Sequence, residues 1–350
     1  MTYSQRLFNF ASVLFMKCWF KHVIRNDQKI FQRLYGENFI DLEEKLAQAT
    51  FVLESSNPFF NIPKPTIYKV LELGGLGIPK AQPLSDASCI CIHIISEWSK
   101  VMNENKKVIL VSFGTVAFSY LMPNETKQAL LQTFNEFSEV IFIWKYEKEE
   151  DNIAEGYPNV ITAKWLPQTD LLAHPNLVAF LTHGGMNSIM QTLSFGKPVI
   201  VVPLFMDQLQ NAALIQRSRT GILLQLSKLI VKQKLRQAIH EIIYNTMYLQ
   251  NAKRISEMMA KRPNPAKEQL IRHVEFAAEF GQIPNFDPYG RKLSFVTYYM
   301  LDIIIPCIFV IFCIISGICW LIFSILRKLY RKLIQNNQCI AVENGEKKNQ

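Results

Sequence analysis

The chain has 350 residues, of which 49% are hydrophobic and 19% charged, with a formal net charge of +9. This composition excludes a disordered chain and leaves room for one large domain or two ordinary ones. Residues 327–350 hold six Lys or Arg and two Glu, so the tail carries +4 of this net charge. Because little positive charge is left for the rest of the chain, no nucleic-acid partner is expected.

Residues 1 to about 60 are expected to be helical and amphipathic, up to Asn57-Pro58. No signal peptide is predicted, because polar residues interrupt the first apolar run and Lys17 closes it without a small-residue cleavage site. A proline-rich stretch follows and contains Gly74-Gly75-Leu76-Gly77. This run lacks the G-x-G-x-x-G spacing and a following helix, so it predicts a bend and not a phosphate loop.

Residues 80–100 are expected to form a connector that leads into a short helix around Trp98. Cys89 and Cys91 have C-x-C spacing, but no second Cys or His pair stands at metal-ligand spacing. Packing is therefore the interpretation of these two thiols, and no metal site is predicted.

From Val108 onward, apolar segments alternate with helical ones. The predicted strands are residues 108–113, 140–144, 160–165, 178–182, 199–203 and 221–226, and the predicted helices between them are residues 124–138, 169–173, 187–195 and 208–217. Continuous apolar strands separated by helices are typical of a parallel sheet covered on both faces. The fold class is therefore α/β, doubly wound.

Helices from about 228 to 280 are expected next, followed by a linker marked by Pro284, Pro288 and Gly290. Residues 303–326 are 24 residues without a charge, long enough for a transmembrane helix. The basic residues after this span predict a cytosolic tail, 327–350, and a lumenal body. Without a signal peptide, however, a tail anchor would leave the body in the cytosol, so either the start of the protein is missing or the topology is inverted.

The stretch from Phe180 to Gln208 carries the predicted chemistry. A strand ends at Thr182-His183, passes through Gly184-Gly185, and continues as a helix from about Asn187. Amides at a helix start form an anion site, and the two glycines would let a diphosphate approach the backbone. His183 can add a hydrogen bond or a positive charge to the phosphate.

Two further positions extend this site. Gln191 lies about one turn, roughly 5.4 Å, along the same helix, which is about the step from a phosphate to a ribose hydroxyl. The loop after the next strand delivers Asp207-Gln208, a carboxylate and an amide suited to the hydroxyls of a hexose. Each feature alone has a structural explanation, such as a turn or a helix cap, and only their order and spacing favour a binding site.

Together with WLPQTDLLAHP, residues 165–175, this stretch resembles the signature of the UDP-glycosyltransferase family, specifically the membrane-bound animal UDP-glucuronosyltransferase type. The resemblance runs from about residue 40 to the C-terminus. It implies a GT-B fold, in which two Rossmann-like domains face each other. The implied domains are a remnant of the acceptor-binding N-terminal domain, 1–95, and the donor-binding domain, 96–290, followed by the span and the tail.

The resemblance also implies roles for individual residues. Trp165 would stack on uracil and Gln168 would contact the uridine. The remaining implied donor-binding residues are His183, Asn187 and Ser188 at the diphosphate, Gln191 at the ribose, Asp207 and Gln208 at the sugar, and Ser112 and Thr115 at the phosphate pocket. The UDP-sugar is a co-substrate, no cofactor is implied, and the absence of a D-x-D sequence argues against a metal-bridged diphosphate.

The sequence departs from the family at two points. The family has an acidic residue where this chain has Gln191, and a neutral hydrogen bond in place of a charge-assisted one predicts donor binding weaker by on the order of 1 kcal/mol. The family's catalytic base, a histidine near the start of the N-terminal domain, has no match here, since neither His22 nor His93 lies at its position. No catalytic residue is therefore assigned within this chain.

Three hypotheses follow. The chain transfers glucuronic acid or glucose from a UDP-sugar to a small lipophilic acceptor with inversion, or it is a catalytically silent UDP-sugar-binding membrane subunit that pairs with a relative in a homo- or hetero-oligomer, or its sequence is incomplete. Lys347-Lys348 at the C-terminus resembles a dilysine retrieval signal, which predicts residence in the endoplasmic-reticulum membrane.

Overall fold

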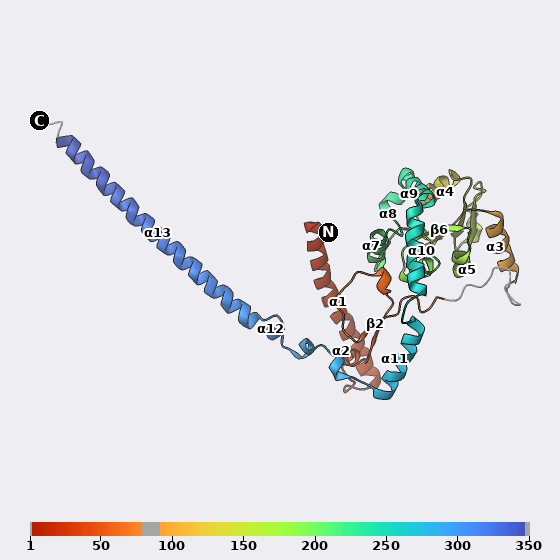
Figure 1. The fold of residues 1–350 in the computed structure, drawn as a ribbon, viewed down its shortest axis with the longest axis horizontal. Coiled ribbons are helices and arrows are strands. Elements are labelled where there is room, and N and C mark those ends of the chain that lie inside the picture. Colours follow the sequence, from red (N-terminus) through yellow and green to blue (C-terminus); the bar gives the residue numbers. More distant parts are fainter. Residues whose placement is uncertain (1, 79–91, 347–350) are drawn as a thin grey trace. The chain divides into compact units, whose positions relative to one another are not determined.

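A computed structural model describes residues 2–78 and 92–346 of the chain, and Cys89 and Cys91 lie outside these residues. The described chain forms two compact units, residues 1–286 and 287–350 (Figure 1). The helices of the first unit are α1 (Tyr3–Tyr35), α2 (Leu42–Ala47), α3 (Ile92–Glu104), α4 (Asn124–Asn135), α5 (Gln168–Ala173), α6 (Met186–Ser194), α7 (Gln208–Ser218), α8 (Leu226–Leu229), α9 (Lys232–Tyr244), α10 (Thr246–Ala260) and α11 (Ala266–Phe280).

The centre of the first unit is a six-stranded parallel sheet in the order β5-β4-β3-β6-β7-β8. Its strands are β3 (Val108–Ser112), β4 (Ile141–Lys145), β5 (Val160–Ala163), β6 (Leu177–Thr182), β7 (Val199–Val201) and β8 (Gly221–Leu223). Each predicted strand contributes to this sheet, which confirms the α/β class. Strands β5, β7 and β8 are each shorter than predicted by two or three residues, and Pro203, which cannot donate to a strand ladder, follows β7 closely.

The sheet is covered on both faces, as the uninterrupted apolar strands predict. Successive side chains of a strand point to opposite faces. Ile109 of β3 packs in a core cluster with α4 and α9, which contribute residues such as Phe134 and Ile239. Its neighbour Leu110 packs in a different cluster with Met102 of α3 and Leu171 of α5. These layers hold the strand ends in fixed positions, where the candidate site lies.

The N-terminal region is only partly helical, so the prediction of helix up to residue 60 is wrong beyond α2. α1 ends at Gly36, whose φ of +101° suits glycine, and β1 (Val52–Glu54) then pairs in parallel with β2 (Val70–Glu72). This strand pairing joins segments that are distant in sequence, which periodicity alone does not detect. The predicted bend at Gly74 is present, and a Cβ there would meet the backbone of Ser56 at 2.6 Å.

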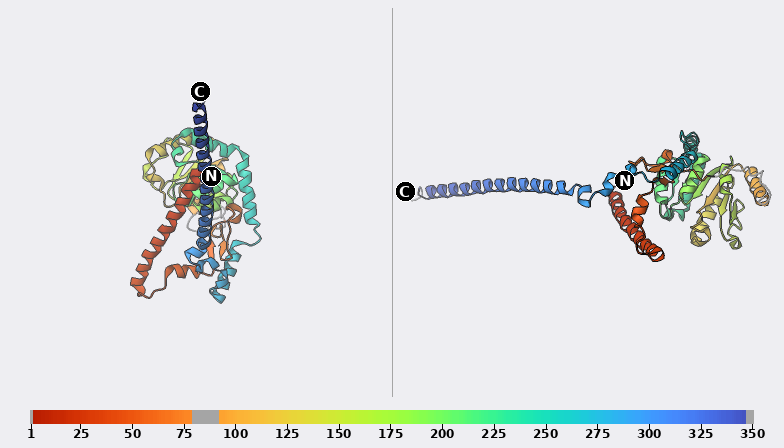
Figure 2. Two further views of the ribbon diagram at one scale, coloured as in Figure 1. Left: turned by 90° about the vertical axis from the view of Figure 1, so that its left-hand side faces the viewer. Right: turned by 90° about the horizontal axis from the view of Figure 1, so that it is seen from below.

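The second unit contains α12 (Phe295–Tyr298) and the 46-residue helix α13 (Leu301–Glu346), which Figure 2 shows as one continuous helix. Short 3₁₀ turns at Pro284–Phe286 and Tyr289–Lys292 occupy the predicted linker. α13 contains the predicted span, 303–326, and continues through most of the predicted tail. Within the described residues, α1 and α13 are both long and apolar enough to cross a membrane, and the sequence predicted only the second as a span.

Candidate functional site

A cavity of about 470 Å³ lies at the carboxyl edge of the six-stranded sheet. It is lined by Ser112 and Lys145, which end β3 and β4, and by His183, which directly follows β6. The strand order runs outward in opposite directions from β3 and β6, and ligands of doubly wound sheets bind at such a reversal. The topology therefore places this cavity where the fold class favours a ligand.

Most of the predicted donor-binding residues lie around this one cavity. The nine that line it are Ser112, Thr115, Trp165, Gln168, His183, Asn187, Ser188, Gln191 and Gln208. Asp207 is not among the lining residues, although it directly precedes Gln208. The lining brings together an exposed indole, a helix start, an imidazole and several amides, and the assignment of each to a part of the ligand stays a prediction.

The imidazole of His183 is partly buried and is held by the ends of the strands. Its Nδ1 lies 3.4 Å from the hydroxyl of Thr182, and the backbone of Ser112 provides a further hydrogen bond. Burial lowers the pKa of His183 from its usual value, whereas the nearby carboxylate of Asp207 and the Ser112 contact oppose that shift. At neutral pH His183 is therefore an uncharged hydrogen-bonding group in the free protein, which favours the hydrogen-bond interpretation over a fixed positive charge.

The glycines beside His183 make room for its ring. A Cβ on Gly185 would lie 2.7 Å from Nε2 of His183, and a Cβ on Gly114 would lie 2.7 Å from Cε1. Gly114 also has a φ of +92°, in the left-handed region that favours glycine. A Cβ on Gly184, at φ +90°, would meet Val201 at 2.6 Å. The Gly-Gly pair is thus required by packing against His183 and β7 before any ligand is considered.

Helix α6 begins at the cavity with its first amides uncapped. Gly185 is its N-cap residue and makes no side-chain capping bond, and Asn187 and Ser188 of the first turn line the cavity. The first N–H groups of a helix lack intrahelical partners, and the helix dipole places partial positive charge there. Together with His183, this arrangement can bind an anion such as a phosphate.

Two glutamines that line the cavity, Gln168 and Gln191, contact each other. Nε2 of Gln168 donates to Oε1 of Gln191 at 2.6 Å and lies 3.5 Å from the hydroxyl of Ser188. With one hydrogen bond accepted, the amide of Gln191 still offers its NH₂ donor and one lone pair of its oxygen to a ligand. Trp165, three residues before Gln168, is 63% exposed at the same cavity, so its ring is available to stack on a planar ligand.

The side chains of Gln208 and Asp207 form hydrogen bonds within the protein. Oε1 of Gln208 accepts from the backbone N–H groups of Leu204 and Phe205 at 2.8 and 3.0 Å, which fixes the loop after β7. Oδ2 of Asp207 accepts from Nδ2 of Asn211 at 2.8 Å, and the same Nδ2 donates to the carbonyl of Gly184. Both side chains therefore brace the loop beside the helix start.

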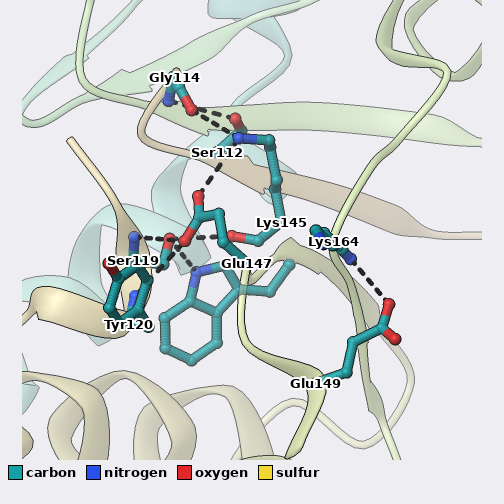
Figure 3. Close-up of polar contacts among 9 residues, drawn as sticks. Ser112, Gly114, Ser119, Tyr120, Lys145, Glu147, Glu149 and Lys164 are labelled. Atoms are coloured by element: carbon teal, nitrogen blue, oxygen red, sulfur yellow. Dashed lines mark hydrogen bonds and ion pairs between the residues drawn. The ribbon is translucent and has the colours of Figure 1, made fainter. Parts of the chain in front are cut away.

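Lys145 lines the cavity and was not predicted. Its Nζ donates to the carbonyl of Gly114 at 2.7 Å and pairs with Glu147 at 3.2 Å (Figure 3). Glu147 in turn accepts from the backbone N–H groups of Ser119 and Tyr120. The position of Lys145 at the carboxyl end of a parallel strand was the available signal. Its ammonium, paired with the carboxylate of Glu147, lines the same cavity as the start of α6.

Among the residues that the structure describes, no group of three or more His, Cys, Asp or Glu side chains could hold a metal ion. The cations and donors around the cavity are Lys145, His183 and the α6 amides. These groups suit an anionic ligand that is bound directly by protein atoms.

Comparisons with known proteins agree with this geometry. Residues 1–339 match the family described as "UDP-glucoronosyl and UDP-glucosyl transferase". The chain is 32% identical over 287 residues to the UDP-glucuronosyltransferase-type protein ugt-48 of Caenorhabditis elegans, covering 81% of this chain and 52% of that protein. It is 29% identical to UDP-glucuronosyltransferase 3A1 of Xenopus laevis over 81% of this chain and 50% of that protein. The chain thus spans about half the length of these relatives.

A crystal structure of the glycotransferase of kitacinnamycin resembles this fold with a TM-score of 0.55 and 19% sequence identity. The likeness covers 78% of this chain and 66% of that one. It confirms the predicted GT-B type of α/β fold.

Proposed function

Because the chain belongs to the UDP-glucuronosyl and UDP-glucosyl transferase family, we propose that the cavity at the carboxyl edge of its sheet binds a UDP-sugar. The single observation that supports this assignment is the shared cavity of Trp165 and the start of α6. A stacking ring and an anion-binding helix start are the two groups that a nucleoside diphosphate needs most.

In this proposal, the diphosphate lies at the first amides of α6 and receives a hydrogen bond from His183. Lys145 adds positive charge from the end of β4. Uracil stacks on Trp165, the ribose lies between Gln168 and Gln191, and Ser112 and Thr115 border the phosphates. The hexose lies toward Asp207 and Gln208.

The proposed reaction is transfer of glucuronic acid or glucose to a hydroxyl of a small lipophilic acceptor, with inversion at the anomeric carbon. The bond from that carbon to the diphosphate oxygen breaks, and a new bond to the acceptor oxygen forms. The hydroxyl proton passes to a base, and UDP leaves with its charge stabilised by the α6 amides, His183 and Lys145. No metal ion is required, since these groups neutralise the leaving group directly.

We further propose residence in the endoplasmic-reticulum membrane, with α13 as the span, a lumenal body and a cytosolic tail. The charge-free segment 303–326 and the basic residues after it support this topology. We propose as well that the chain pairs with a relative in a homo- or hetero-oligomer.

One observation favours the alternative of a silent binding subunit. Among the described residues that line the cavity, His183 is the single imidazole, and in the proposed complex it faces the phosphates. A base for the acceptor hydroxyl must then come from another part of the enzyme. Binding without turnover by this chain alone is the outcome that this alternative predicts.

Calorimetric titration of the purified chain with UDP tests the site. Trp165→Ala is expected to cost about 1–3 kcal/mol of stacking, which weakens binding roughly fivefold to 150-fold. Trp19→Ala, which removes an exposed tryptophan of α1, is the matched control and is expected to leave the affinity unchanged. Equal affinities of the wild type and Trp165→Ala would remove the uracil site from the proposal.

Turnover is tested separately with labelled UDP-glucose and UDP-glucuronic acid and a phenol as acceptor. Formation of labelled glycoside supports transfer by this chain, and the donor that yields the labelled product identifies the sugar. Tight UDP binding without product supports the silent subunit, and neither binding nor product contradicts both.

A further inference from the structure

The loop between β3 and the 3₁₀ turn Ser119–Leu121 forms one wall of the nucleotide cavity. Its residues 113–117 all line that cavity. Gly114 has a left-handed φ of +92°, which turns the chain at this point, and Val116 is 73% exposed. The course of the loop therefore decides how closely a phosphate can approach this wall.

Two charged side chains from the end of β4 hold the two ends of the loop (Figure 3). At the first end, Nζ of Lys145 donates to the carbonyl of Gly114 at 2.7 Å. At the other end, Oε2 of Glu147 accepts from the N–H groups of Ser119 and Tyr120 at 2.8 and 3.4 Å. Lys145 and Glu147 lie 3.2 Å apart, so a single ion pair joins both ends of the loop.

The spacing of these two residues explains why both reach the same loop. Lys145 is the last residue of β4, and Glu147 follows two positions later, where the side chains of an extended chain lie on the same side. Tyr146 between them is 1% exposed and packs in the core. Phe118, the N-cap residue of the 3₁₀ turn, provides no side-chain cap, so Glu147 supplies an acceptor from another segment.

The stability of the fold does not by itself explain this ion pair. The side chains of Lys145 and Glu147 are only 16% and 11% exposed, and desolvation of two charges offsets much of their attraction. Ser119 is also anchored independently, because its hydroxyl donates to the carbonyl of Lys145 and accepts from the indole N–H of Trp144. The loop would thus remain attached without the carboxylate.

We propose that Glu147 is a positioning residue of the nucleotide site, an inference that rests on the proposed UDP-sugar function. Glu147 is not among the residues that line the cavity, so it acts through its partners. It fixes the far end of the loop and orients the ammonium of Lys145. An ammonium has three N–H donors, and its bonds to Gly114 and Glu147 leave the third for a phosphate oxygen.

The sign of the effect of Glu147→Gln separates positioning from simple charge. A carboxylate repels a diphosphate, so loss of its charge alone would tighten UDP binding. A positioning role predicts the opposite. The amide keeps an oxygen for the N–H of Ser119 but gives up the ionic bond to Lys145, so the charge-assisted bond from Lys145 to the phosphate is misdirected and UDP affinity falls on the order of tenfold.

The test is titration of the full chain with UDP, by calorimetry, and with uridine, by NMR. Because uridine lacks phosphates, Glu147→Gln is expected to change its affinity by less than about twofold. Asp151→Asn is the matched control, since it removes one carboxylate from the same segment. Asp151 accepts from the hydroxyl of Tyr146, pairs with Lys148 and is not among the lining residues, so both affinities are expected to stay unchanged.

A second variant, Lys145→Met, removes the group through which Glu147 reaches the phosphate. In this background Glu147→Gln is expected to change UDP affinity by less than about twofold, because the hydroxyl of Ser119 still anchors the other end of the loop. A residue that only stabilised the fold would weaken UDP and uridine alike and would do so in both backgrounds.

Three results would overturn the positioning role. Unchanged or tighter UDP binding by Glu147→Gln would leave Glu147 as no more than a nearby charge. Equal loss of UDP and uridine affinity, or loss of cooperative unfolding, would make it a group that stabilises the fold. An undiminished effect in the Lys145→Met background would mean that the two side chains act independently. These results leave the proposed function standing, whereas wild-type protein that binds neither UDP nor uridine would contradict that function and this proposal with it.

Discussion

The fit of His183 between two glycines predicts the effect of Gly185→Ala. The added Cβ would lie 2.7 Å from Nε2 and 3.1 Å from Cε1 of His183, so the ring must move by about 0.7 Å to reach ordinary contact near 3.4 Å. Gly185 itself has φ −60° and ψ +136°, which alanine adopts without strain. The cost therefore arises from overpacking, about 1–3 kcal/mol of unfolding free energy.

The same displacement should weaken UDP binding. Loss of one hydrogen bond from His183 is worth about 0.5–1.5 kcal/mol, which raises the dissociation constant roughly twofold to tenfold. Calorimetry and thermal unfolding measure the two effects. Gly77→Ala is the matched control, since Gly77 also lacks a positive φ and a Cβ there meets nothing within 4 Å.

A second background isolates the mechanism. In His183→Ala protein the ring is absent, so Gly185→Ala is expected to change UDP affinity by less than about twofold. If Gly185→Ala weakens binding equally in both backgrounds, the reasoning from ring displacement is refuted, and the added methyl group would instead obstruct the ligand itself.

Three other measurements test neighbouring groups. UDP binding should take up protons and tighten as pH falls from 8 to 6, because burial lowers the pKa of His183 in the free protein and a bound diphosphate raises it. Calorimetric titrations in buffers of different ionisation enthalpy measure this proton uptake, and His183→Gln should abolish it. Gln191→Glu keeps an oxygen toward Gln168 and adds a charged acceptor for ribose hydroxyls, so UDP should bind about fivefold to tenfold tighter while 2′-deoxy-UDP gains less. Burial lowers the pKa of Lys197 to about 8, below its value in the unfolded chain. The cost of burying its charge is therefore relieved as pH rises from 8 to about 10.5, where the unfolded chain still binds the proton. In chemical denaturation, the unfolding free energy of the wild type should rise over this range by at most on the order of 3 kcal/mol more than that of Lys197→Met.

The parallel sheet could be predicted from the sequence because its strands are locally distinctive. Runs such as 108–112 are entirely buried in the structure, and a strand covered on both faces needs apolar residues at every position. Strands β1 and β2 escaped prediction because each has only two apolar residues before a Glu, and they pair across an intervening segment. Strands β7 and β8 are equally short, but they lie within the longer apolar runs 199–203 and 221–226, which gave a recognisable signal.

The composition of the candidate site was also largely predictable, because carboxyl ends of parallel strands converge on one edge. The order of the segments predicted that His183 and Gln208 lie near one another, and the family resemblance added Ser112; all three line the same cavity. Side-chain direction was not predictable. Asp207 turns toward Asn211, and the oxygen of Gln208 turns toward its own loop, since each satisfies neighbouring backbone or amide donors.

The function of the paired glycines shows why such local contacts matter. From the sequence, Gly184 and Gly185 were explained by close approach of a phosphate, whereas the structure shows contacts of their missing side chains with Val201 and His183. Both explanations require glycine, but they predict different results. A phosphate-only role makes Gly185→Ala harmful to binding whatever residue stands at 183, and a packing role makes it harmful only when the imidazole is present. The same packing partly buries His183, and this burial lowers the pKa of its imidazole.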